Sequence, residues 1–421
     1  MAGKTLVEKI FSAHCNRDVK AGDVVVADID FCFGQDGTSG LIIDSFEKLG
    51  AKKIFNRERF SMVIDHSSPS PNIGISEVHN KMRRFAKKHR LDVFFDVGNG
   101  VCHQVIPESG LIAPGSLVVG ADSHTCTYGA LGAFSTGMGS TDIAITLASG
   151  KNWFKVPETI KIILYGKPKK GVYSKDVILY IIGAVGADYA TYKAVEFSGD
   201  YIKQLSMDAR FTITNMAVEM GAKAGLIEPD AKTYAWLRAR HLRFKGKILK
   251  SDKDAIYSEI LKFDVSKIIP QVARPHRVDN VVGVDKVKDV KIQEAFIGTC
   301  TNGRLEDLEI AASILKKARV HKDVKMIIVP ASREIFQEAL KRGIIPKFIM
   351  AGACVVSPGC GPCVGTHMGI PSNGENVIST ANRNFKGRMG NPDAFIYLAS
   401  PATVTASAIE GKITDPRKYI G

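Results

Sequence analysis

Short apolar runs with the composition of β-strands alternate with helical patterns along nearly the whole chain. A strand is predicted over residues 24–29 and a helix over 41–49, followed by a strand over 61–66 and a longer helix over 75–91. Such alternation is typical of βαβ units, whose parallel strands are covered by helices on both faces. Because the pattern recurs, we expect an α/β protein with several sheet layers rather than one. Further strands are predicted over residues 93–96, 117–120, 160–164, 295–298 and 324–329.

The length of the chain and two changes in composition predict three domains. A chain of 421 residues is long enough for two or three hydrophobic cores. Val156 and Pro157 precede a new strand, and a polar stretch over 245–288, rich in lysine and aspartate, precedes the strand that leads to Cys300. We therefore predict domains over residues 1–156, 157–287 and 288–421.

The balance of charge makes the surface basic. Lysine and arginine number 57 against 43 aspartate and glutamate, an excess of 14 positive charges. Such a surface attracts anions, which leaves nucleic acid, an anionic membrane and a small polycarboxylate as candidate partners. The basic residues of the helix over 75–91 are predicted to form a solvated face rather than a nucleic-acid patch.

Composition also excludes the membrane and secreted classes. The longest apolar stretch, residues 177–187, contains glycine and is far short of the roughly 20 residues that span a bilayer. Eight cysteines are too sparse for a disulfide-stapled scaffold, and the N-terminus leads into no apolar core of a signal peptide. We therefore expect a cytoplasmic protein.

Three of the cysteines stand out by their surroundings. Cys360 and Cys363 are separated by two residues in a turn rich in glycine and proline, which directs both sulfurs and several backbone N–H groups to one point. Alone, this pair fits a zinc knuckle or a redox pair. Cys300 follows a predicted strand and precedes a predicted helix over 304–318, whose N-terminus favours negative charge.

The number of available cysteines separates the metal-site alternatives. A structural zinc site needs four ligands, commonly in two Cys-x-x-Cys pairs, and Cys300 has no partner two to four residues away. An electron-transfer 4Fe-4S cluster normally takes four cysteines, and only Cys354 could supply the fourth; its strand-like surroundings favour a buried core residue instead. Three cysteines would leave one iron open as a Lewis acid for a substrate hydroxyl and carboxylate. The other cysteines are predicted to be core or wall residues: Cys15, Cys32, Cys102 and Cys126.

A segment suited to anions follows the cysteine turn. Residues 380–388 hold Arg383 and Arg388 together with Asn382 and Asn384. Guanidinium groups bind carboxylates through two parallel hydrogen bonds, so this segment suits a di- or tricarboxylate. A phosphate or an RNA backbone also fits it.

Acidic and histidine residues follow three of the predicted strands. Asp65 and His66 end one strand, Asp122 and His124 follow another, and His103 follows a third. Open α/β sheets bind their ligands at the carboxyl ends of strands. A carboxylate beside an imidazole suits general acid–base chemistry, so proton transfer is predicted here; surface or capping pairs are the alternative.

Asn215 and Glu219 stand four residues apart, so they are predicted to share one face of a short helix. A solvent-facing polar pair is the alternative. The glycine run over 137–140 lacks the third glycine of a dinucleotide fingerprint, and the sequence has no phosphate-binding P-loop. Nucleotide cofactors therefore have no support.

Taken together and in chain order, these segments resemble motifs of the aconitase superfamily, most closely the large subunits of isopropylmalate dehydratases and homoaconitases. With a further match over 400–406, the resemblance covers nearly the whole chain. It implies three α/β/α domains around a central iron–sulfur active site. The matching segments are residues 63–66, 101–104, 120–125, 214–221, 298–303, 359–365 and 381–388.

The resemblance also implies a cofactor and roles for the matching side chains. One 4Fe-4S cluster would be held by Cys300, Cys360 and Cys363, with substrate on the iron that has no cysteine. Many relatives have histidine where this chain has Gln35. The implied catalytic residues are Asp65, His66, His103, Asp122, His124 and Glu219, and the implied substrate-binding residues are Gln35, Ser123, Asn215, Asn382, Arg383 and Arg388.

The activity that the resemblance implies is that of a hydro-lyase with a partner. It would interconvert 2-isopropylmalate and 3-isopropylmalate through isopropylmaleate, as in leucine biosynthesis. The alternatives are homoaconitate chemistry of the lysine or coenzyme B route and another hydro-lyase of the aconitase type. Single-chain aconitases carry a fourth, mobile domain that supplies a serine base and a further arginine, and this chain stops at Gly421 without one. A separate small subunit is therefore expected to supply both groups.

Two other classes remain as alternatives. An RNA-binding protein would use the basic surface when the cluster is lost, but the sequence has no RRM, KH or zinc-finger signature, so no nucleic-acid partner is expected. A pure electron carrier would need Cys354 as a fourth cluster ligand.

Overall fold

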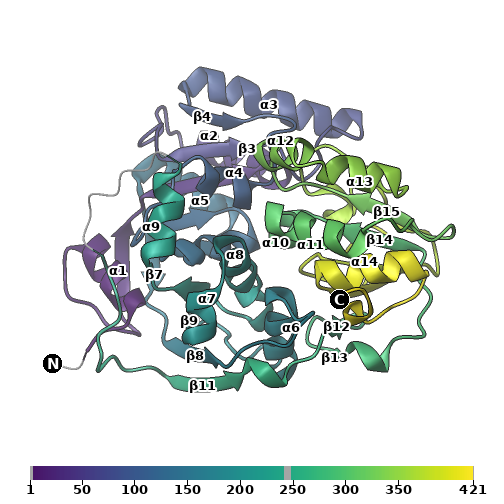
Figure 1. The fold of residues 1–421 in the computed structure, drawn as a ribbon. Helices are drawn as coiled ribbons and strands as arrows, with labels where there is room; N and C mark the ends of the chain where they lie inside the picture. Colours follow the sequence, from purple (N-terminus) through teal and green to yellow (C-terminus); the bar gives the residue numbers. More distant parts are fainter. Residues whose placement is uncertain (1–2, 241–247, 421) are drawn as a thin grey trace.

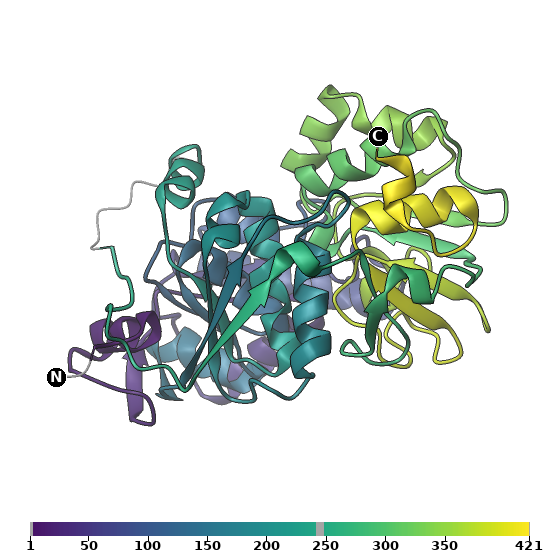
Figure 2. The ribbon, with the colours of Figure 1, turned by 60° about the horizontal axis from the view of Figure 1, so that its bottom comes forward.

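The computed structural model describes residues 3–240 and 248–420, whose strands form three larger sheets and one two-stranded sheet. In Figure 1 the chain of the first large sheet, purple to blue, lies at the top and back, and that of the third, green to yellow, lies on the right. The second, in teal, lies at the lower left and beside the third in the turned view of Figure 2. The predicted α/β class is confirmed.

The first large sheet has five parallel strands in the order β4-β3-β2-β5-β6. Its strands β2, β3 and β5 are buried along their whole lengths, as is usual for parallel strands covered on both faces. Because all five run the same way, the loops after their carboxyl ends lie at one edge. This part of the chain comprises α1 (Leu6–Cys15), β2 (Phe31–Gln35), α2 (Asp36–Lys48), β3 (Phe60–Val63), α3 (Ile73–His89), β4 (Val93–Phe95), α4 (Cys102–Glu108), β5 (Leu117–Gly120), the 3-10 helix η1 (Ser123–Leu131), β6 (Phe134–Gly137) and α5 (Ser140–Ser149).

A small antiparallel sheet pairs β1 (Val24–Asp28) with β7 (Lys151–Lys155). Side chains along both strands alternate between buried and exposed. The buried apolar ones, Val25, Ala27 and Phe154, pack in the same core cluster as Phe11 of α1. One face of this small sheet is therefore part of the core and the other faces solvent.

The second large sheet has four parallel strands in the order β10-β9-β8-β11. Its core contains α6, whose apolar side chains are mostly buried. This part comprises β8 (Thr159–Tyr165), α6 (Ser174–Val185), β9 (Ala194–Ser198), α7 (Asp200–Gln204), α8 (Met207–Asn215), η2 (Met216–Met220), β10 (Ala224–Ile227), α9 (Ala231–Arg238), β11 (Glu259–Asp264) and η3 (Val265–Lys267).

The third large sheet has seven strands in the order β13-β12-β18-β17-β14-β15-β16, in which β12 runs antiparallel to both of its neighbours, β13 and β18. The strands β12 and β13 precede residue 287, whereas the other five strands follow it, so the sheet contains strands from both sides of the domain boundary expected there. The three domain ranges stay a prediction. The elements are β12 (Gln271–Ala273), β13 (Val281–Gly283), η4 (Val284–Lys286), β14 (Glu294–Ile297), α10 (Thr299–Asn302), α11 (Leu305–Leu315), β15 (Lys325–Ile328), α12 (Arg333–Lys341), α13 (Ile344–Met350), β16 (Cys354–Val355), η5 (Gly361–Val364), β17 (Asn376–Ser379), β18 (Phe395–Ala399), α14 (Pro401–Glu410) and η6 (Pro416–Tyr419).

Two predicted elements differ from the structure in ways that matter for the site. The strand expected over 61–66 ends at Val63, so Asp65 and His66 lie in the loop that follows it. The prediction that Cys354 is buried is wrong, because β16 lies at the edge of its sheet and the side chain of Cys354 is exposed.

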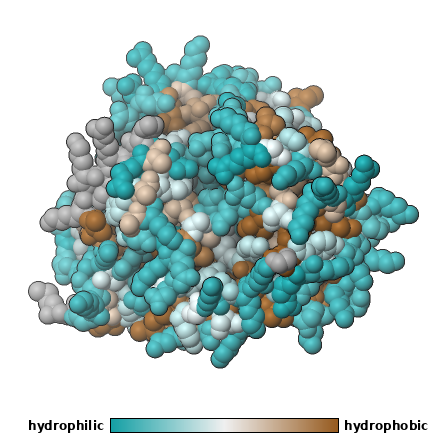
Figure 3. All heavy atoms as spheres, viewed as in Figure 1, coloured by the Kyte–Doolittle hydropathy of each residue, from teal (hydrophilic) through white to brown (hydrophobic). Residues whose placement is uncertain are grey.

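One face of the helix α3 is basic and exposed. The residues Arg83, Arg84, Lys87 and Lys88 lie on it, so their exposure to solvent is as expected, and the expected lack of a nucleic-acid role stays a prediction. In the described residues, no helix is both long enough and apolar enough to cross a membrane. Hydrophilic residues cover most of the face in Figure 3, with hydrophobic residues in small groups between them.

Candidate active site

Loops that follow strands of the first and third large sheets line a common cavity of about 190 Å³. Three of the predicted site residues lie directly behind its wall: Asp65 is hydrogen-bonded to His66, Asn215 to Cys300 and Glu219 to His124. The structure thus brings the predicted residues to one place. Those that line the cavity are Gln35, His66, His103, Asp122, Ser123, His124, Cys300, Cys360, Cys363, Asn382, Arg383 and Arg388.

The loop after β3 is held by the buried carboxylate of Asp36, at the start of α2. Its Oδ1 accepts hydrogen bonds from the backbone N–H groups of Asp65 (3.1 Å) and His66 (2.8 Å), and its Oδ2 accepts one from Ser67 (2.8 Å). Burial disfavours the charged form, but the His79 side chain and these donors hold the pKa of Asp36 well below its usual range. The ionised carboxylate therefore fixes the positions of Asp65 and His66.

Asp122 joins two histidines of the site. Its Oδ2 lies 3.2 Å from His66 Nε2, and its Oδ1 lies 2.7 Å from His103 Nε2. On the other side of its ring, His66 places Nδ1 2.8 Å from Asp65 Oδ1. Burial opposes the charge of Asp122, but His103 and the other imidazole and backbone donors hold its pKa well below the usual range.

The two histidines differ in their electrostatic surroundings. Burial alone would lower the pKa of His66, but Cys360, Asp65 and Asp122 raise it well above the ordinary value. At His103 burial dominates and lowers the pKa, although Asp122 is beside it. One imidazole is thus disposed to carry a proton and the other to be neutral, an arrangement suited to acid–base exchange.

Glu219 ties His124 to Arg383. Its Oε1 lies 2.7 Å from His124 Nε2 and accepts a hydrogen bond from Arg383 Nε at 2.8 Å. A second nitrogen of that guanidinium, Nη1, donates to Ser123 Oγ at 2.9 Å. Burial opposes the charge of Glu219, but His124 and Arg383 lower its pKa below the ordinary value. The guanidinium is thereby held at the wall of the cavity.

The prediction that Asn215 and Glu219 share one helix face is wrong. The helix α8 ends at Asn215, and Glu219 lies in the tighter 3-10 helix η2, where residues three apart eclipse one another. Both side chains are buried, so neither faces solvent. Asn215 donates to Thr127 Oγ1 at 2.8 Å, whereas Glu219 meets His124.

Nitrogen donors approach the three cysteine sulfurs expected to hold a cluster. All three thiols are free and buried, and they line the same cavity. The nearest donors are Asn215 Nδ2 and Asn382 Nδ2, 3.3 and 3.5 Å from Cys300 Sγ, Arg388 Nη2, 3.6 Å from Cys363 Sγ, and His66 Nδ1, 3.7 Å from Cys360 Sγ.

Comparison with known proteins gives the family. A model of the aconitase family, described as aconitate hydratase, matches residues 8–411. The chain belongs to the aconitase family. Members of this family carry a 4Fe-4S cluster.

Several relatives match the chain from end to end. The 3-isopropylmalate dehydratase large subunit 1 of Thermotoga maritima is 54% identical over 99% of this chain and 100% of its own length. The 3-isopropylmalate dehydratase large subunit 1 of Pyrococcus furiosus is 49% identical over 100% of both chains. That of Methanopyrus kandleri is 47% identical over 99% of this chain and 100% of its own length. Among solved structures, the holo-form of Thermococcus kodakaraensis aconitase X has a TM-score of 0.52 at 12% identity, over 90% of this chain and 89% of that one. It shares the aconitase-like fold.

The chemistry of the site fits the family's cluster. Burial raises the pKa of the Cys300 thiol to about 11, so this sulfur is a thiolate near neutral pH only when a cation binds it. The nitrogen donors around the three sulfurs would stabilise that negative charge. Asn382 Oδ1 and Arg388 Nε are buried without a hydrogen-bond partner in the described residues, which leaves both for a bound group.

Sequence reasoning missed Arg304, a fully buried residue behind Cys300. Its Nη2 donates to the Cys300 carbonyl at 2.6 Å and its Nε to Gln104 Oε1 at 3.0 Å. Gln104 lies on α4 next to His103, so Arg304 links the Cys300 turn to the helix that carries His103. The available signal was a charged residue directly after the segment over 298–303.

Lys175, at the start of α6, was missed as well. Its buried Nζ donates to the carbonyls of Thr380 (3.0 Å) and Ala381 (2.6 Å) and so supports the segment that carries Asn382 and Arg383. Burial lowers the pKa of Lys175 to about 7. The signal in the sequence was a lysine beside an aspartate at the start of a helix that is apolar over most of its remaining length.

Proposed function

We propose that this chain is the large subunit of a 3-isopropylmalate dehydratase, a cytoplasmic hydro-lyase of leucine biosynthesis. It interconverts 2-isopropylmalate and 3-isopropylmalate by removing water and adding it back at the neighbouring carbon. The observation that carries the proposal is the convergence of buried thiols, arginines and carboxylate–imidazole pairs on one cavity. Full-length relatives that are 47% to 54% identical to this chain bear the same name.

In this proposal Cys300, Cys360 and Cys363 hold the 4Fe-4S cluster. When bound, a cluster with one iron free of cysteine supplies a Lewis acid for the hydroxyl and carboxylate groups of the substrate. The side-chain amides of Asn215 and Asn382 donate to the Cys300 sulfur and stabilise its charge. The protein's own side chains supply the binding and the proton transfers.

Arg383 and Arg388 bind the carboxylates of the substrate. Glu219 and Ser123 fix Nε and Nη1 of Arg383, which leaves Nη2 to face a ligand. The buried Nε of Arg388, which has no partner in the described residues, gains one when a carboxylate binds. Because a guanidinium binds a carboxylate in a defined plane, the two arginines orient the substrate in the cavity.

His66 moves the proton of the hydroxyl that leaves and returns. Asp65 fixes Nδ1 of the ring and Asp122 faces Nε2, so the imidazole is held in one orientation while it donates and recovers a proton. His103 shares Asp122 with it and lines the same cavity, and its Nδ1 has no partner in the described residues. Gln35 completes the wall on this side.

A separate small subunit supplies the serine base that removes the carbon-bound proton, and a further arginine. This part of the proposal is supported by the resemblance to two-subunit relatives and by the names of those relatives, which are large subunits. Homoaconitase activity is the alternative, since both activities share the motifs present here. The small subunit is expected to decide between the two substrates.

The test is an anaerobic assay of the cluster-reconstituted chain with its cognate small subunit. We expect conversion of 2-isopropylmalate to 3-isopropylmalate, followed by the ultraviolet absorbance of the alkene intermediate. Cys300→Ala should abolish both turnover and the visible absorbance of the cluster, whereas Cys354→Ala, at an exposed edge-strand position, should preserve both. Turnover of homoaconitate without turnover of isopropylmalate would contradict the assignment.

A further inference from the structure

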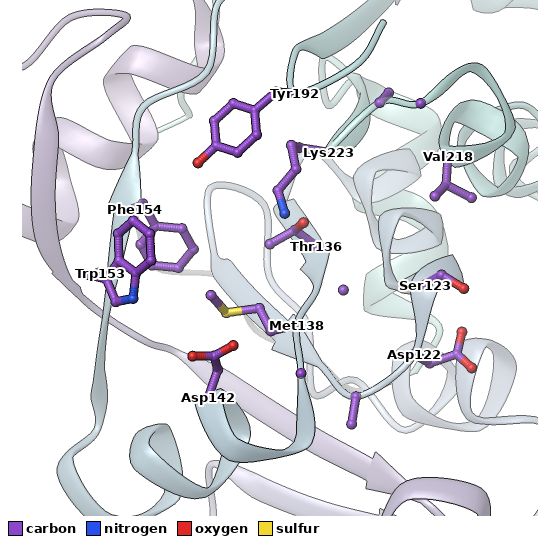
Figure 4. A pocket seen from close by; sticks show the side chains of 15 residues that line it. Asp122, Ser123, Thr136, Met138, Asp142, Trp153, Phe154, Tyr192, Val218 and Lys223 are labelled. Carbon is purple, nitrogen blue, oxygen red and sulfur yellow. The ribbon is translucent and has the colours of Figure 1, made fainter. Parts of the chain in front are cut away.

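A second cavity, of about 560 Å³, adjoins the candidate active site. The two cavities share Asp122 and Ser123 in their walls. Figure 4 shows Asp122 and Ser123 on one side of this groove and Trp153 and Phe154 of β7 on the other, with Tyr192 beside them. The groove therefore runs from the wall of the site to the small sheet of β1 and β7.

The solvent face of that small sheet is apolar. Val24, Val26 and Trp153 are 65%, 62% and 58% exposed, and Val26 is paired directly with Trp153 across the two strands. Their neighbours Val25 and Phe154 point into the core, so the alternation of the strands puts the three exposed side chains on one face. Grouped exposed apolar residues mark interaction surfaces, and tryptophan contributes strongly to binding at such surfaces.

Charges of both signs lie beside the apolar residues, because Asp142 lines the groove and Lys151 Nζ lies 3.2 Å from Asp28 Oδ1. Lys151 and Lys155 flank Trp153 on the exposed face of β7. Inside the groove, Lys223 Nζ lies 5.5 Å from the centre of the Tyr192 ring. Tyr192 itself stays partly exposed in a left-handed backbone conformation, with φ of 62°. No ion pair involves Lys155 in the described residues, so an acidic residue beside the apolar segment of a partner would find its counter-charge there.

We propose that this groove and the exposed face of β1 and β7 form the docking surface for the small subunit, which meets the lysines with acidic residues. The inference rests on the proposed function. The small subunit is the expected occupant because the groove is continuous with the active site. One end of the groove is at Ser123, whose hydroxyl accepts a hydrogen bond from Arg383, so a subunit that reaches the substrate also passes over the groove. Its contacts then extend along the groove to Trp153.

Calorimetric titration of the cluster-reconstituted chain with its cognate small subunit tests the surface. Val26→Asp and Trp153→Ala should each raise the Kd for the small subunit at least about tenfold, because each removes one apolar contact that is well buried in the complex. Lys155→Glu should slow association most strongly at low salt. Ile349→Asp is the matched control and should bind like the wild type, because Ile349 is 59% exposed on α13, which lies on the opposite side of the molecule from β7 in Figure 1. Equal thermal unfolding temperatures would show that all variants fold.

Tryptophan fluorescence gives a readout independent of these variants. The chain has two tryptophans, so Trp236→Phe leaves Trp153 as the sole reporter. Binding of a small subunit made without tryptophan should shift the emission of Trp153 to shorter wavelength, because the interface excludes water from the indole ring.

The outcomes separate this inference from the proposed function. If the complex turns over isopropylmalate while Val26→Asp and Trp153→Ala bind as tightly as the wild type, the docking surface is overturned and the function stands. If no small subunit binds and no substrate is turned over, the proposed function fails and this inference with it. If Val26→Asp abolishes self-association of the chain in sedimentation but leaves the small subunit's Kd unchanged, a second copy occupies the surface and the inference is overturned.

Discussion

Buried carboxylates in this protein keep or lose their charge according to the donors around each one. At Asp36 and Asp122, backbone and imidazole N–H groups surround the carboxylate and favour the anion despite burial. Glu294, on β14, is fully buried, and the positive charge near it is Lys325 Nζ at 3.5 Å. Burial therefore raises the pKa of Glu294 to about 7.

Glu294→Gln should make the stability of the protein less dependent on pH. A carboxyl group whose pKa is raised by folding holds its proton more tightly in the folded chain, so it stabilises the fold at low pH. This contribution is lost as the pH rises from 4.5, the ordinary pKa, through about 7. The difference corresponds to about 3 kcal/mol. Thermal unfolding at about pH 5 and about pH 8 should show the glutamine variant gaining on the wild type as the pH rises.

Glu375→Gln is the matched control for that measurement. Glu375 contacts the same lysine, at 2.8 Å, but lies partly exposed. Burial opposes its charge, yet Lys325 lowers its pKa below the ordinary value, so the sign of its pH dependence is reversed. Parallel pH profiles for the wild type and Glu294→Gln would contradict the role assigned to Glu294.

Close packing between elements determines where the site residues stand. The 3-10 helix η1 begins with Ser123 and His124 and packs on β10 through Gly129 and Gly225. A Cβ atom at position 129 would lie 1.6 Å from the carbonyl oxygen of Gly225. No side chain fits there, so the absence of one at Gly129 sets how closely η1 approaches β10.

Gly129→Ala should therefore lower both stability and activity. The added methyl group forces η1 away from β10 and displaces His124 from Glu219, which we expect to cost at least about tenfold in kcat. Gly40→Ala is the control, because a Cβ atom there on α2 meets no atom within 4 Å. Alanine in a helix is favoured by roughly 0.5–1 kcal/mol, so the control should be slightly more stable and fully active. A Gly129→Ala enzyme with wild-type kcat and melting temperature would refute this packing argument.

Some elements could be predicted from the sequence and others could not. The strand expected over 117–120 is β5, because an apolar run between turns is a local signal. The end of α8 at Asn215 carries no comparable signal, since glycine comes only at Gly221. Contacts from another part of the chain surround this end: Thr214 Oγ1 donates to the carbonyl of Thr127 on η1 at 2.8 Å.

At the scale of the whole molecule, the site lies where separate sheets meet. The aspartates and histidines come from segments that follow strands of the first large sheet, and the cysteines and arginines from segments that follow strands of the third. The second contributes Asn215 and Glu219 from the end of α8 and from η2. The sheets are held by large hydrophobic clusters. Most side chains of these clusters do not belong to the site, so the sheets do not depend on the thiols for their packing.

Removal of the cluster should therefore loosen the site without unfolding the sheets. After anaerobic chelation, we expect amide hydrogen exchange to rise at least about tenfold over residues 299–303 and 359–365, the two segments proposed above to hold the cluster. Exchange in the buried strands β2 and β8 should not change, nor should far-UV circular dichroism. Cys300→Ala should resemble the chelated protein before any chelator is added. Loss of most secondary structure on chelation would show that the cluster holds the whole fold.

The amino-acid sequence by itself determined the α/β class and the set of chemical groups at the site. Strand periodicity, a Gly/Pro turn and a pair of cysteines are local properties, so they can be recognised without knowing what lies across the molecule. The tertiary structure alone decided that residues from Gln35 to Arg388 line one cavity and that Cys354 lies exposed at a sheet edge. It also decided that Arg304 and Lys175 support the site from behind. The physical reason is that which strand ends face each other depends on how the separate hydrophobic cores pack together, and no local pattern encodes those long-range contacts.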